Sequence, residues 1–171
     1  MINEDLKLRG DVAIVLKDKN GNVKESRDIT NLVVSAGLEF ICSRMAGTSA
    51  GVMSHMALGS GTTAAAAGDT DLESILGARE ALDSSTATAN AIVYVSSFEA
   101  GEGTGAVTEA GIFNAASSGT MLCHVIFPVV NKSADDTMKI TWQSIVPLDA
   151  ALNIPASVTA PVPSPASNDE T

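Results

Sequence analysis

The chain has 171 residues, a formal net charge of −10 and an aromatic content of only 4%. This length suits one folded domain with an appendage. With so few aromatic residues, the interior has to be filled by aliphatic side chains and methionine, which suits the thin packing of sheet on sheet.

The negative charge is unevenly distributed. Residues 1–28 carry six basic and six acidic side chains, whereas the rest of the chain has four basic and fourteen acidic ones. Nucleic-acid binding depends on clustered Lys and Arg that neutralise phosphates, so we expect no nucleic-acid partner. Solubility is the simpler role for this charge.

Neither terminus nor interior predicts membrane insertion or secretion. The first residues, MINEDLKLRG, are charged and contain no apolar run, so we expect no secretory signal. No segment has the roughly 18 to 20 apolar residues that span a bilayer, and we expect no membrane partner. The two cysteines, Cys42 and Cys123, are too few for a disulfide scaffold and are expected to be reduced and buried.

The first part of the chain predicts a hairpin followed by a helix. Residues 11–17 and 23–29 have strand-forming patterns around the turn dipeptide Asn20-Gly21. Residues 36–46 are predicted to be helical, with Ser35 as the N-terminal cap and Gly47 as the stop. The expected apolar stripe of this helix comprises Leu38, Ile41, Cys42 and Met45.

The rest of the chain reads mainly as strands, at residues 52–58, 91–98, 106–115, 121–130 and 137–146. A capping-box spacing between Thr70 and Glu73 predicts a single helical turn at residues 71–76. We therefore expect a mainly β protein, an antiparallel β-sandwich with one short α-helix and an extended C-terminal arm. The core is expected to contain Ile14, Leu38, Ile41, Val93, Ile112, Leu122, Ile126, Ile140 and Trp142.

The composition changes after residue 149. Residues 150–171 hold four of the six prolines and have no apolar period, which predicts an extended arm without its own core. The expected organisation is a β-sandwich domain with an N-terminal hairpin at residues 1–149, followed by this proline-rich arm, which we expect to act as an intermolecular tether.

No candidate for a catalytic, cofactor or metal site meets its chemical requirements. The Gly-rich residues 59–63 lack the lysine of a phosphate-binding loop, and Gly101 to Gly105 is expected to be a hairpin tip. Cys123 and His124 are adjacent, so in a strand they point to opposite faces, and with Cys42 and His55 they do not form a zinc motif. Asp135-Asp136 is expected in a solvated turn, and Gly111, after Glu109, at a bulge or a close backbone approach. No nucleophile–base pattern is present, and we expect no enzyme and no cofactor.

Four segments resemble a family of small virion structural proteins of tailed bacteriophages. They are MSHMALGSGTTAAAAGDTDLESILGAR at residues 53–79, TEAGIF at 108–113, GTMLCHVIFPVVNK at 119–132 and MKITW at 138–142. The resemblance extends over about residues 10–142 and brings no catalytic residue with it. It implies a virion component, assembled in the host cytoplasm, whose partners are the major capsid protein or tail proteins and further copies of itself.

Three functions remain open within this expectation. The first is a capsid decoration or cement protein that stabilises the shell, which the short chain, the terminal arm and the lack of heptad or fibrous repeats favour. The second is a tail-fibre, collar or baseplate component. The third is a glycan-binding module for host recognition, although exposed aromatic platforms are scarce because Tyr94 and Trp142 are the only residues of their types.

Overall fold

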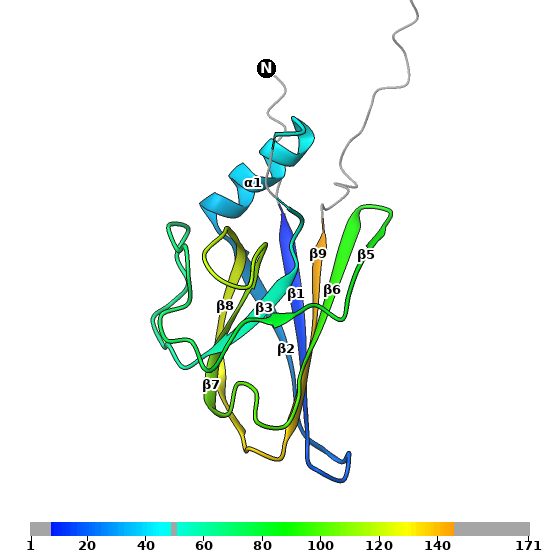
Figure 1. Cartoon of the computed structure of the whole chain (residues 1–171), viewed down its shortest axis with the longest axis vertical. Coiled ribbons are helices and arrows are strands. Elements are labelled where there is room, and N and C mark those ends of the chain that lie inside the picture. Colours follow the sequence, from blue (N-terminus) through cyan, green and yellow to red (C-terminus); the bar gives the residue numbers. More distant parts are fainter. Residues whose placement is uncertain (1–7, 49–50, 146–171) are drawn as a thin grey trace, which may run out of the picture.

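The computed structural model describes residues 8–48 and 51–145, which form a mainly β protein with a single helix in that part of the chain (Figure 1). The antiparallel, β-rich fold expected from the sequence is confirmed. The elements in chain order are β1 (Arg9–Lys17), β2 (Val23–Val33), α1 (Ser35–Met45), β3 (His55–Gly59), β4 (Glu80–Ala81), β5 (Ser84–Thr88), β6 (Ala91–Phe98), β7 (Gly105–Phe113), β8 (Met121–Lys132) and β9 (Thr137–Ile145).

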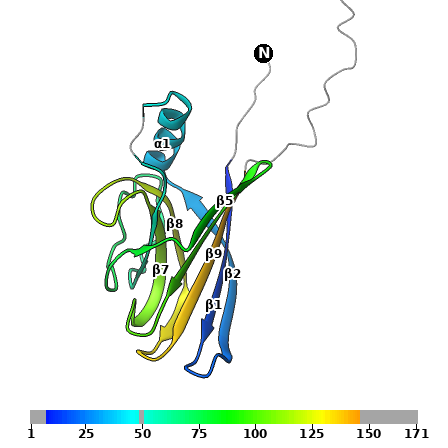
Figure 2. The same ribbon diagram turned by 45° about the vertical axis from the view of Figure 1, so that its right-hand side comes forward.

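The strands form one antiparallel sheet that curls on itself in the order β4-β3-β7-β8-β2-β1-β9-β6-β5. Strand β2 joins the two halves, because most of it pairs with β1 while its last residues, Leu32 and Val33, pair with β8. Figure 2 shows β7 and β8 on one side and β1, β2 and β9 on the other. The arrangement is consistent with the expected sandwich, built here from one continuous curled sheet.

The core lies between the two halves. Alternate residues of β1 point inward, and β9 contributes Ile140 and Trp142 from the next strand. These side chains belong to the same apolar cluster as Met56, Leu58 and Ile112 from the opposite half. Sheet pleating thus gives each half one apolar face, and the curl buries both faces against each other.

Most of the expected core is confirmed, with the exceptions explained by strand phase and helix position. Ile14, Ile112, Leu122, Ile140 and Trp142 are buried. In β6 the inward positions are Tyr94, Ser96 and Phe98, which leaves Val93 only half-buried. Ile41 and Ile126 are also half-buried, and Leu38 is exposed, so its assignment to the core was wrong.

Helix α1 lies at one end of the molecule and contacts β8 through its smallest residue. A Cβ atom at Gly37 would lie 2.2 Å from the carbonyl oxygen of Leu122, so only glycine permits this approach. The predicted cap was wrong: the N-cap is Val34, without a side-chain cap, and Ser35 donates its backbone N–H to the Ala67 carbonyl. The predicted stop at Gly47 is confirmed by its φ of 68°.

The segment from β4 to β5 connects the two edges of the sheet, and neither strand was predicted. Just after β4, Leu82 donates its N–H to the Ser54 carbonyl at one edge, and Asp83 donates to the Val95 carbonyl at the other. The predicted helical turn at residues 71–76 is wrong, because Ile75 forms an isolated bridge with Gly59. Residues 101–105 link β6 to β7 across the two halves, so they are not a hairpin tip.

Several expectations concern the ends of the chain. The predicted arm at residues 150–171 and the domain boundary at residue 149 lie outside the described residues.

Within residues 8–48 and 51–145, no helix has both the length and the apolar character needed to cross a membrane.

Trp142 offers a direct test of the core. Its side chain is fully buried, so we expect Trp142→Ala to lower the free energy of unfolding by about 3 to 5 kcal/mol. Its indole N–H has no partner among the described residues, so Trp142→Phe should cost less than Trp142→Ala. Urea denaturation measures both variants, and an unchanged midpoint for Trp142→Ala would contradict this packing.

Candidate functional site

A buried polar cluster lies on the outer face of β7 and β8, under the loop of residues 60–76. Its members are Glu109 on β7, His124 on β8 and Asp69 in the loop. His124 Nε2 lies 3.1 Å from a carboxylate oxygen of Glu109, and His124 Nδ1 lies 2.7 Å from Asp69. Glu109 and His124 are both almost completely buried, so the cluster belongs to the interior of the protein.

The Glu109 carboxylate binds the backbone of the loop. It accepts N–H bonds from Gly61 and Ser74 at 2.8 Å each and from Glu73 at 3.0 Å. A buried carboxylate is costly unless its oxygens are well bonded, and here backbone donors and a histidine supply those bonds. Glu109 therefore joins two distant parts of the loop to strand β7.

The Gly-rich residues 59–63 do present N–H groups to anions, but the anions are side chains of this protein. Thr62 and Thr63 each donate a backbone N–H to Glu73 at 2.9 Å, and Gly61 donates to Glu109. The spacing of Thr70 and Glu73 therefore does not mark a helix cap. The N–H groups that a phosphate would require are already occupied.

His124 lies beside carboxylates, as catalytic histidines often do, but both of its ring nitrogens are already bonded. Both ring nitrogens point at carboxylates on different sides, so the ring offers no third partner a hydrogen bond. In the part of the chain that the structure describes, no three His, Cys, Asp or Glu side chains are placed to hold a metal ion. His55 has a separate partner, with Nδ1 2.8 Å from Ser54 Oγ.

The cysteines and the paired aspartates are placed differently from one another. Cys123 points into the core, where burial raises the pKa of its thiol to about 12, whereas Cys42 is exposed, against expectation. Asp135 is exposed in its turn. Asp136 is buried, bonding the Lys24 amine at 2.6 Å and the Ser133 N–H at 2.8 Å, so the expectation of a solvated pair holds only for Asp135.

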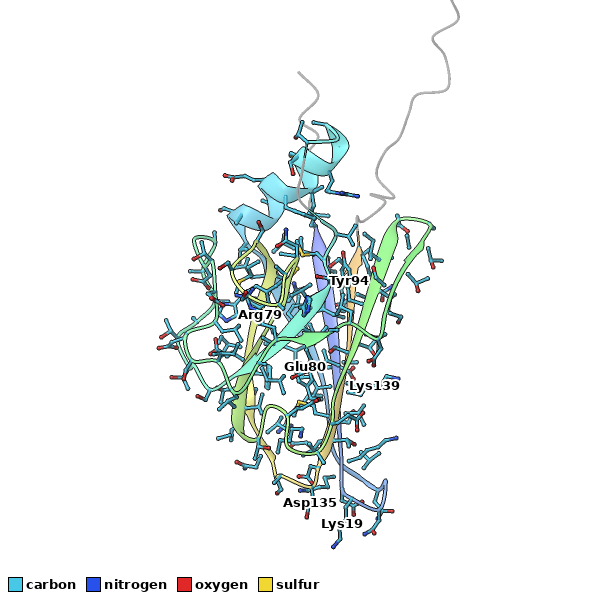
Figure 3. All side chains as sticks on the ribbon, in the orientation of Figure 1. Lys19, Arg79, Glu80, Tyr94, Asp135 and Lys139 are labelled. Carbon is cyan, nitrogen blue, oxygen red and sulfur yellow. The ribbon has the colours of Figure 1, made fainter. Side chains whose placement is uncertain are left out.

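A second clamp, made by Arg79, holds the same loop at Asp71. The Arg79 side chain pairs with Asp71 at 3.0 Å, donates to the Ala115 carbonyl at 3.2 Å and lies over the Phe113 ring, with 3.6 Å to its centroid. Figure 3 shows Arg79 beside the β7 and β8 half of the sheet. Neither Arg79 nor Asp69 was singled out from sequence, because their partners are distant along the chain.

Glu109 and Gly111 show how β7 is adapted to this loop. The register between β7 and β8 shifts between Val107 and Glu109 and again between Ile112 and Phe113. Gly111 itself is not a bulge, and its close neighbours are side chains and not backbone, since a Cβ atom there would lie 3.1 Å from both Leu72 and Phe113. The loop thus packs directly on the strand that supplies its main carboxylate.

An apolar groove opens at the end of the molecule that carries α1. Its volume is about 540 Å³, and its walls come from α1, from the segment before β3, from β6 and from the end of β9. Met45 is 84% exposed there, and Val52 and Ile92 are also exposed. Figure 3 shows Tyr94, one of the lining residues, toward this end, and the charged residues Lys19 and Asp135 at the opposite end.

This apolar groove is the candidate interaction surface of the protein. Exposed clusters of large apolar side chains favour contact with another polypeptide or ligand. Comparisons with protein-family models, with curated proteins and with solved structures find no match to this chain. The support for a function therefore comes from the sequence segments and geometry of the chain itself.

The carboxylate cluster predicts a large effect of Glu109. We expect Glu109→Ala to lower the free energy of unfolding by about 3 to 5 kcal/mol, because it leaves buried N–H groups and His124 without their partner. Glu73→Ala is the matched control on the exposed side of the same loop and should have a smaller effect. Urea denaturation compares them, and equal losses would contradict a special role for Glu109.

Acid should weaken the loop. The pKa of Asp69 is lowered, first by the Ala66 N–H and then by His124, and the pKa of Glu73 is lowered by the N–H groups and hydroxyl of the threonines it binds. These contributions are fully present above the carboxyl pKa of the unfolded chain, about 4, and are lost as pH falls through the lower folded values.

We therefore expect wild type and Asp69→Asn to differ in stability at about pH 5 and to converge toward about pH 2. Thermal unfolding across this range measures the difference between the two. A constant difference would show that the Asp69 charge contributes nothing to folding.

Proposed function

We propose that this chain is a virion structural protein of a tailed bacteriophage, and that it acts as a decoration or cement protein on the capsid. The four segments that resemble such proteins include β3, the clamped loop, most of β7, β8 and part of β9. Their polar residues have structural partners: Glu109 and Glu73 bind backbone N–H groups, and His124 lies between two carboxylates. This use of polar groups supports a scaffold in preference to an enzyme.

The observation that carries the proposal is the exposed apolar groove at one end of an otherwise well-packed β scaffold. A cement protein needs a surface that binds neighbouring subunits and a body that stays folded under load. The groove supplies such a surface. The hydrogen bonds of Glu109 and Arg79 stabilise the loop of residues 60–76 and so the folded domain. The proposed partners are the major capsid protein and further copies of this chain.

The glycan-binding alternative gains nothing from the aromatic residues. Sugar-binding platforms need exposed aromatic faces, but Trp142, Phe98 and Phe113 are completely buried and Tyr94 is nearly so. The tail-component alternative is separated from the capsid proposal by copy number.

The copy number of the chain per particle tests the assignment. A protein that binds the shell at every capsomer should be present in hundreds of copies, in a fixed ratio to the major capsid protein. Quantitative mass spectrometry of purified particles of the phage encoding this chain measures that ratio. About a dozen copies or fewer would move the assignment to the tail or a vertex.

Heating tests what the protein does for the particle. A ligand that binds only the assembled shell stabilises it by mass action, so particles lacking this chain should release DNA at a lower temperature. Adsorption to host cells is the control and should remain normal. Equal DNA release with failed adsorption or failed tail assembly would contradict the capsid role.

A further inference from the structure

The apolar groove adjoins the point where the described chain ends. Ser144 on β9 lies in the groove wall, and Ile145 pairs with Arg9 on β1 and Ala91 on β6. Residue 146 therefore follows directly from a strand that forms part of the groove. The groove also opens onto the core, because Met53, Tyr94 and Leu122 belong to both.

The sequence after Ile145 has two parts of different composition. Residues 146–154, VPLDAALNI, carry four large aliphatic side chains and a single charge. Residues 155–171 contain four prolines, and their only large aliphatic residues are Val158 and Val162. The first part has the character of a segment that binds an apolar surface, and the second that of an extended linker.

The N-terminal residues are a weaker match for the groove. Leu8 lines the groove, but the preceding residues 1–7, MINEDLK, include three charged side chains. Burying those charges without partners would be costly. The composition of the two candidate segments therefore favours residues 146–154.

We propose that the occupant of the apolar groove is residues 146–154 of the same chain. Nine extended residues span about 30 Å, enough to turn back over a groove whose wall starts at Ser144. Covalent attachment gives such a segment an effective concentration in the millimolar range, which favours its own groove over that of another copy.

This binding would cover apolar side chains that are exposed in the described part of the chain, Met45, Val52 and Ile92 among them. It would also fix the position from which residues 155–171 leave the domain. The proposal concerns the isolated protein and does not depend on a role in a virion; in a particle, a neighbouring subunit would have to displace residues 146–154 to bind the groove.

Stability measurements test the proposal with matched variants. Met45 lines the groove, whereas Leu38 lies on the same helix outside the groove lining, and both are exposed in the described part. If residues 146–154 cover the groove, Met45→Gln should lower the thermal midpoint of the full-length protein by about 2–4 °C, and Leu38→Gln should leave it nearly unchanged.

The segment itself is tested in the same assay. The double variant Leu148→Asp and Leu152→Asp should lower the midpoint by about 4–8 °C, whereas removal of residues 155–171 should have no effect. Adding Met45→Gln to the double variant should cause little further loss, because both changes disrupt the same contact. Full additivity, or an unchanged midpoint for the double variant, would overturn the proposal.

Disulfide trapping identifies the occupant directly. In a Cys42→Ser background, where the remaining Cys123 is buried, Met45→Cys combined with Leu152→Cys should form an intrachain disulfide on mild oxidation. Met45→Cys with Val158→Cys is the control and should remain largely reduced. Disulfide-linked dimers would show that a second copy fills the groove, and loss of stability on removing residues 1–7 alone would show that the N-terminal segment does. Either result would overturn the proposal.

Discussion

The bonds between the Glu109 carboxylate and the backbone of residues 61–74 organise one whole side of this protein. A charge buried at this depth is tolerated only when its oxygens are fully bonded, and the donors here come from both ends of one loop and from His124. The loop thereby covers the outer face of β7 and β8, which would otherwise expose apolar residues such as Met121. A segment rich in Gly, Ala and Thr, with Leu72 and Leu76 as its packed aliphatic side chains, is thus held by buried hydrogen bonds as well as by packing.

The same logic explains why the two ends of the molecule differ. At the turn end, Lys132 is buried and donates to the Glu99 and Asp136 carbonyls, while burial lowers the pKa of its amine. Asp136 in turn binds Lys24, so this end is closed by charged and backbone groups. At the helix end the contacts are apolar and incomplete, since α1 touches β8 mainly through Gly37 and leaves Met45 exposed. Binding of another segment at the helix end would therefore bury apolar side chains that are exposed in the described structure.

Local sequence patterns predicted the strands in which apolar and polar residues alternate. They did not predict the elements and contacts that depend on residues distant in the chain. The β1–β2 hairpin follows from short-range alternation, whereas β5 (SSTAT) has no buried residue that would mark it as a strand. The range of α1 was predicted, but its expected apolar stripe was wrong: Leu38, Cys42 and Met45 are exposed, and the helix packs through Gly37. Glu109 and His124 lie on neighbouring strands, but Asp69 contacts His124 from a separate loop, and no spacing in the sequence predicts this contact. The Thr70 and Glu73 spacing misled for the same reason: the Glu73 carboxylate binds N–H groups that precede it in the chain.

Glu109 should hold the loop as firmly as the sheet holds its strands. Native-state hydrogen exchange of the Gly61, Glu73 and Ser74 amides measures this directly, because each donates to the Glu109 carboxylate. We expect these amides to exchange about as slowly as those in the centre of β7. Exchange as fast as that of the exposed turn at Gly21 would contradict it and show that the loop opens independently of the sheet.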